Sequence, residues 1–131
     1  MKSQTFTIQG ELMDLNAFIK ALNSHYIVGN RAKQENTDAV SYSAKKAKIK
    51  PVETYPVMIA FTWYSPNERK DIDNVAFAKK FVLDGLVRAG VLENDGRKQI
   101  RGFEKEIFLI DKNNPRIEIT IIENNASNEM A

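Results

Sequence analysis

The spacing of hydrophobic residues near the N-terminus changes twice within thirty residues. Polar and apolar residues alternate over 5–8, which predicts a short strand that ends at Gly10. Asp14 is suited to cap a helix, and apolar residues then recur at helical spacing from Leu15 to about His25. A helix is therefore expected over 15–25, and Gly29-Asn30 is expected to break it.

The middle of the chain contains a nearly continuous apolar run between two expected helices. Alanines and lysines over 37–48 favour a basic amphipathic helix. The run over 56–63 is rich in β-branched and aromatic residues, which indicates a buried central strand. A polar loop over 65–70 follows, and a strong helix is expected from about residue 73 to about 89. Gly90 stands where a C-terminal cap is needed.

Two further strands are expected in the last third of the chain. A turn-rich stretch over 93–96 leads to a strand over 100–110 and a strictly alternating strand over 117–122. The polar segment 111–115 between them is a hairpin signal. Together these elements predict the α/β (α+β) class, with a mixed β-sheet and helices packed against it.

Length and composition limit what the chain can be. It has 131 residues, which suits one domain, expected over 1–123 and followed by a flexible tail over 124–131. Absence of cysteine and the presence of one histidine, His25, exclude cysteine-ligated zinc, thiol chemistry and two-histidine metal motifs. His25 itself is expected to end a helix. Without a signal peptide or an apolar run long enough to span a bilayer, a cytoplasmic protein without membrane contact is expected.

The positive charge is unevenly distributed. The chain carries 19 basic and 17 acidic residues, but residues 31–50 hold six basic residues against only two acidic ones. Such a segment indicates either a contact with a polyanion or a solvated helix face, and charge alone does not decide between them.

Paired carboxylates mark the segment that carries candidate chemistry. Asp71 and Asp73 are two residues apart, so in an extended segment both side chains point to one side. Their mutual repulsion is relieved by a divalent cation, which prefers hard oxygen ligands. The alternative is an ordinary helix cap, since Asp-x-Asp-Asn is also a common helix start. Lys80 lies seven residues beyond Asp73 on one helical stripe, about 10 Å along the axis, and Asp84 can pair with it.

The stretch from Asp71 to Asp95 resembles the core of the RusA family of Holliday-junction resolvases. The resemblance rests on Asp71-Ile72-Asp73-Asn74 at a helix start, a lysine within the helix, an Ala-Gly helix end and an acidic residue in the following loop, and it covers about 57–122. It implies a small α/β homodimer that cuts four-way DNA junctions symmetrically with Mg²⁺, or Mn²⁺ in its place. It places metal carboxylates on Asp71, Asp73 and Asp95, and the functional lysine on Lys80, with Lys79 as the other option.

The nuclease interpretation assigns DNA-backbone contacts to basic residues near the aspartates and in the basic segment. These are Arg69, Lys70, Lys79, Lys45, Lys46, Lys48, Arg97, Lys98 and Arg101. Two alternatives remain open. The chain is a non-catalytic nucleic-acid-binding module whose acids only cap helices, or a metal-dependent phosphodiesterase acting on small nucleotides.

Overall fold

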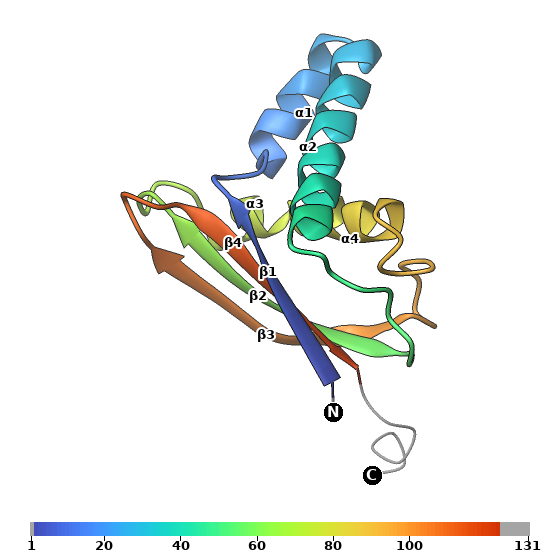
Figure 1. Ribbon diagram of the computed structural model, residues 1–131. Coiled ribbons are helices and arrows are strands. Elements are labelled where there is room, and N and C mark those ends of the chain that lie inside the picture. The colour runs from blue at the N-terminus through green and yellow to red at the C-terminus, as the bar shows by residue number, and fades with distance from the viewer. Residues whose placement is uncertain (1, 124–131) are drawn as a thin grey trace.

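The computed structural model describes residues 2–123, which fold as one four-stranded mixed sheet with all the helices on one of its faces (Figure 1). The tail expected over 124–131 lies outside the described residues. The strands have the order β1-β4-β2-β3, in which β4 is antiparallel to β1 and β2 while β2 and β3 are parallel. The predicted α+β class is confirmed. The strands are β1 (Lys2–Gln9), β2 (Val57–Ser65), β3 (Ile100–Ile110) and β4 (Arg116–Glu123), and the helices are α1 (Leu15–Ser24), α2 (Tyr26–Lys46), α3 (Ile72–Ala76) and α4 (Lys79–Arg88).

The side chains of alternate residues in the two inner strands form the core. Every second residue of β2 and β4 is buried against the helices, and the residues between them are only partly covered. The apolar run over 56–63 is therefore an inner strand, as its composition predicts. The largest fully buried side chains include Trp63, Phe61, Phe81, Ile59, Leu86 and Ile119.

The first helical break lies at His25 and not at Gly29-Asn30. His25 has an extended backbone (φ −171°, ψ 144°) and its Nδ1 accepts a hydrogen bond from Ile27 N at 3.1 Å, so this residue ends α1 and caps α2. The prediction that His25 ends a helix is confirmed. Gly29 continues α2 because its missing side chain lets α1 approach: a Cβ there would lie 2.3 Å from Leu22 Cδ2.

The helix expected over 73–89 is two helices, which is a second correction. At Phe77 and Ala78 the backbone hydrogen bonds change from the α-helical pattern to bonds that reach three residues back. Ala78 N donates to Val75 O, and Lys80 N donates to Phe77 O. The ring of Phe77 then lies against Phe18 of α1, with 5.3 Å between ring centroids. The predicted end of the helix is confirmed: Gly90 has φ +79°, and Gly90 N and Val91 N donate to the last turn of α4.

The predicted hairpin between the last two strands is wrong. Both strands form within a residue of their expected limits, but β2 lies between them in the sheet. The turn over 111–115 therefore passes across the end of β2, where Asp111 N donates to Ser65 O at 2.8 Å. As a result β3 is an edge strand whose outer side has no partner among residues 2–123.

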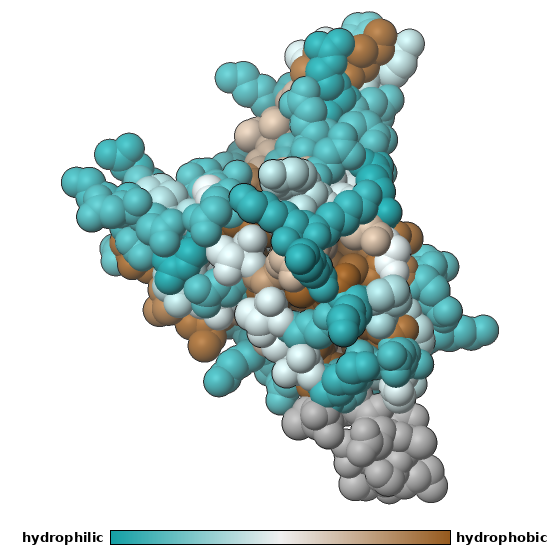
Figure 2. Space-filling model, viewed as in Figure 1, coloured by the Kyte–Doolittle hydropathy of each residue, from teal (hydrophilic) through white to brown (hydrophobic). Residues whose placement is uncertain are grey.

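Most of the large apolar side chains that are exposed lie in two regions (Figure 2). One is the tip of the α1–α2 hairpin, which projects beyond the sheet (Figure 1). The other lies along β3, where Phe103, Ile107, Leu109 and Ile110 are each between 38% and 50% exposed. An apolar edge strand of this kind is a natural surface for pairing with another strand.

Candidate functional site

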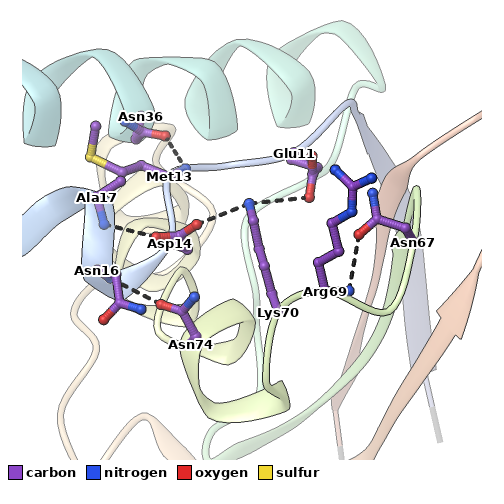
Figure 3. A network of polar contacts seen from close by, with 10 residues as sticks. All are labelled: Glu11, Met13, Asp14, Asn16, Ala17, Asn36, Asn67, Arg69, Lys70 and Asn74. Atoms are coloured by element: carbon purple, nitrogen blue, oxygen red, sulfur yellow. Dashed lines mark hydrogen bonds and ion pairs between the residues drawn. The ribbon is translucent and has the colours of Figure 1, made fainter.

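An ion pair and a helix cap position the loop that carries the candidate aspartates. Lys70 Nζ lies 2.9 Å from Asp14 Oδ2 and 3.6 Å from Glu11 Oε1 (Figure 3). Asp14 also caps α1, since its Oδ1 accepts a hydrogen bond from Ala17 N at 2.8 Å. The predicted cap is therefore confirmed, and the same carboxylate holds the residue that precedes Asp71.

These contacts shift the pKa of both partners. Partial burial raises the pKa of Asp14, but the Ala17 N–H and the Lys70 ammonium outweigh it and hold the pKa below its usual value. The hydrogen bond to Asp14 raises the pKa of Lys70 above its usual value, with Glu11 adding to the effect. Lys70 thus anchors the loop before Asp71 through two carboxylates of its own chain, and its role in DNA contact stays a prediction.

Two asparagines complete the network around the start of α3. Asn74 Oδ1 accepts a hydrogen bond from Asn16 N at 2.9 Å, which ties the first turn of α3 to that of α1 (Figure 3). Asn36 Oδ1 of α2 accepts one from Met13 N at 2.8 Å. The asparagine of the Asp-x-Asp-Asn motif therefore has a structural role that the helix-start pattern alone does not reveal.

Asp71 and Asp73 are both exposed at the beginning of α3. The Asp71 carboxylate makes no capping hydrogen bond, although its backbone carbonyl accepts from Asn74 N and Val75 N. Asp73 Oδ1 accepts from Asn74 N at 3.0 Å. Within the described chain neither carboxylate has an ion-pair partner. The expected extended geometry is wrong, because Asp73 already belongs to the helix.

A groove separates Asp71 from the end of β3. Its volume is about 430 Å³, and Asp71 lines it together with Ile72 and Val75 of α3 and the last residues of β3. Ile72 is 60% exposed and Ile110 is 50% exposed, so apolar side chains rim the groove close to the free edge of β3. Asp73 is not among its lining residues.

Asp95 lies at the opposite end of the sheet from Asp71. Because β2 and β3 are parallel, the connection that leaves β2 near Asp71 must travel back along the sheet before β3 begins. The turn containing Asp95 is tied to the start of β3, where Ile100 N donates to Gly96 O at 3.0 Å. The nine residues of β2 correspond to a separation of about 30 Å.

The expected three-aspartate pocket is therefore not formed within one chain. Over residues 2–123 no three His, Cys, Asp or Glu side chains gather closely enough to hold a metal ion. Spacing along the sequence could not reveal this, because the separation is set by the parallel pairing of β2 and β3.

Lys80 lies on α4 in a different pocket from Asp71. Its Nζ is 3.5 Å from Asp84 Oδ2, which confirms the expected pairing at i and i+4. Its side chain is 58% exposed and lines a pocket with Phe18 and Lys33. The break at Phe77 means that Asp73 and Lys80 do not share one continuous helical stripe.

Lys79, the other candidate lysine, points into the molecule. Its Nζ lies 2.8 Å from Glu106 Oε1 and 4.3 Å from the centroid of the Phe103 ring. Glu106 Oε2 also accepts a hydrogen bond from Trp63 Nε1 at 2.9 Å. In the sequence, Glu104 and Glu106 alternate with Phe103 and Ile107, which predicts that both glutamates lie on the solvated side of the strand. For Glu106 this prediction is wrong, because its half-buried carboxylate accepts from Trp63 and pairs with Lys79.

The remaining basic candidates are distributed over several elements. Lys45, Lys46 and Lys48 are exposed at the C-terminal end of α2, and Arg97 and Lys98 are exposed in the turn after Asp95. Arg69 is exposed beside Asp71, and Arg101 is exposed near the start of β3. Their role in DNA contact stays a prediction.

Over residues 2–123 no helix is long and apolar enough to cross a bilayer.

Comparison with known proteins assigns no family to this chain. No protein-family model matches the sequence, and no curated protein matches it.

Proposed function

We propose that this chain is a Mg²⁺-dependent endonuclease that cuts four-way DNA junctions as a homodimer. The observation that carries the proposal is the pair Asp71 and Asp73, which are exposed and have no ion-pair partner among residues 2–123, on a turn that Lys70 and Asn74 anchor to α1. Two carboxylates that stand two residues apart with no counter-charge among residues 2–123 attract a divalent cation, which prefers hard oxygen ligands.

The two carboxylates suit Mg²⁺, which commonly takes one or two carboxylates and keeps several waters. When bound, the ion supplies an acidified water and neutralises charge on the scissile phosphate. Asp71 and Asp73 would hold it, and the Lys70 contact keeps their backbone in place. Lys80 is then suited to a neighbouring phosphate, because it lines a different pocket from Asp71.

A second copy of the chain would bring Asp95 to this pair. If two β3 edges paired antiparallel about a two-fold axis, Ile100 of one chain would lie beside Ile110 of the other. Ile110 lines the groove of Asp71, and Ile100 follows closely after Asp95. Each metal site would then combine Asp71 and Asp73 of one chain with Asp95 of its partner. The apolar residues exposed on β3 supply the surface for such pairing.

The exposed lysines at the end of α2 and the arginine and lysine after Asp95 would contact backbone phosphates. Because such contacts release counterions, DNA affinity should fall steeply as salt rises. The same surface suits the second candidate function, a non-catalytic nucleic-acid-binding module. The observation that favours this candidate is the wide separation of Asp95 from Asp71 within one chain.

Cleavage of a labelled synthetic four-way junction tests the proposal. The wild-type protein should nick it with Mg²⁺ and not with EDTA, and Asp73→Asn should abolish nicking while leaving junction binding intact. Glu35→Gln is the control, because it removes a carboxylate from the exposed face of α2. Binding without any metal-dependent nicking would support the binding module, and normal cutting by Asp73→Asn would overturn the assignment of the site.

A further inference from the structure

A small aromatic pocket lies where α1, α2 and the break between α3 and α4 meet. Phe18, Phe77 and Phe81 line it, with their ring centroids 5.3 to 5.7 Å apart. Phe81 is fully buried, whereas Phe18 and Phe77 are half-buried and expose part of their rings. The pocket volume is about 150 Å³. A cavity of about this size accommodates one six-membered aromatic ring.

Two lysines flank this aromatic pocket. Lys33 of α2 is half-buried there and has no hydrogen-bond or ion-pair partner within residues 2–123. Lys80 of α4 is 58% exposed, and its carboxylate partner Asp84 is at 3.5 Å. A half-buried ammonium with no counter-charge among residues 2–123 favours a bound anion, because an anion supplies the charge-assisted hydrogen bonds that the ammonium lacks.

We propose that this pocket binds an unpaired pyrimidine base of a DNA strand, with the phosphate of that nucleotide between Lys33 and Lys80. The pyrimidine ring matches the aromatic lining, since bases stack on aromatic side chains largely irrespective of sequence. Its single six-membered ring matches the pocket volume of about 150 Å³ more closely than the larger fused ring system of a purine does. The inference rests on the proposed function only in assuming that the chain binds DNA.

Binding of three duplexes by the full chain in EDTA, where nothing is cut, tests the inference. The duplexes carry one unpaired thymidine, one unpaired adenosine or one abasic site, and fluorescence anisotropy measures their affinities. The thymidine duplex should bind about tenfold more tightly than the abasic duplex. Equal affinity for the three duplexes, or no binding to any of them, would overturn the inference.

Two variants separate this pocket from general phosphate binding. Phe77→Leu keeps an apolar side chain but removes the ring, so the preference for thymidine should disappear. Lys33→Gln should also remove most of that preference. Lys45→Gln, which removes the same charge from the exposed end of α2, should weaken binding to all three duplexes equally. If Lys33→Gln behaves as Lys45→Gln does, the pocket does not hold the base.

A direct measurement uses thymidine 5′-monophosphate as the probe. The aromatic proton resonances of Phe18 and Phe77 should shift when it is added and should not shift with inorganic phosphate. No shift with either compound would contradict the pocket. Failure of the nuclease proposal looks different: DNA would be bound with a thymidine preference but never cut. Cutting of junctions without any such preference would reject this inference alone.

Discussion

Lys70 Nζ lies 2.9 Å from Asp14 Oδ2, and this ion pair joins the loop before α3 to the first turn of α1. Because Lys70 immediately precedes Asp71, the pair fixes the backbone that presents the candidate metal carboxylates. Asp14 is 14% exposed at its side chain, so the contact is partly shielded from solvent. Its contribution should therefore exceed that of an ordinary surface ion pair.

Replacement of Asp14 by alanine should lower the free energy of unfolding by about 1–2 kcal/mol. The variant loses the hydrogen bond to Ala17 N and one of the two carboxylates near Lys70. Urea denaturation measures the change, and Glu35→Gln is the control. A stability equal to that of the wild type would show that neither the cap nor the ion pair matters.

The Asp14 contribution should depend on pH in a defined direction. The folded pKa of Asp14 is below its usual value, and the unfolded value is about 3.9. The stabilisation is therefore complete above about pH 4 and is lost as the pH falls through the folded pKa. Asp14→Asn retains a capping oxygen but not the charge, so its stability should approach that of the wild type below pH 4. A difference that stays constant from pH 7 to pH 3 would contradict this.

Gly85→Ala should destabilise the protein through the contact between α2 and α4. A Cβ at residue 85 would lie 2.5 Å from Val40 Cβ and 3.0 Å from Thr37 O, so the helices must separate. Overpacking of this kind costs about 1–3 kcal/mol. Gly102→Ala is a matched control, because its Cβ would meet only Met58 Cε at 3.8 Å. Equal melting temperatures for the two variants would show that α2 and α4 separate without a loss of stability.

Glu106→Leu should lower the unfolding free energy by about 3 kcal/mol. The change removes the acceptor for Trp63 Nε1 and leaves the Lys79 ammonium half-buried without a counter-charge. Glu104→Leu, on the same strand but exposed, should have little effect. Thermal melting followed by Trp63 fluorescence compares the two variants, and equal destabilisation would contradict the assigned role of Glu106.

The pattern of apolar and polar residues predicted those elements that neighbouring residues in the sequence determine. The continuous apolar run of β2, the alternation in β4 and the glycine cap after α4 were sufficient, because they depend on residue type, on side-chain period and on φ. The break at Phe77 and the continuation of α2 through Gly29 depend instead on packing between helices: Phe77 against Phe18, and Gly29 against Leu22. Such contacts leave no signal in the spacing of apolar residues.

The register of β3 explains why Glu106 was missed. A shift in pairing between β2 and β3 occurs at Ile59 and Ala60, where Phe103 and Lys105 are the successive partners and Glu104 is the extra residue. The bulge reverses the alternation, so that Glu106 shares the helix-covered face with Phe103. Sequence could suggest that Asp71 and Asp73 stand together at a helix start, but the position of Asp95 depends on the parallel crossover.

The most direct test of the composite metal site is a heterodimer of Asp73→Asn and Asp95→Asn chains, purified with two different affinity tags. Each homodimer should fail to cut a four-way junction, because both of its sites lack one carboxylate. If Asp95 serves the partner chain, the heterodimer contains one intact site and should nick one strand with Mg²⁺. A heterodimer as inactive as both homodimers, or normal cutting by the Asp95→Asn homodimer, would contradict the composite site.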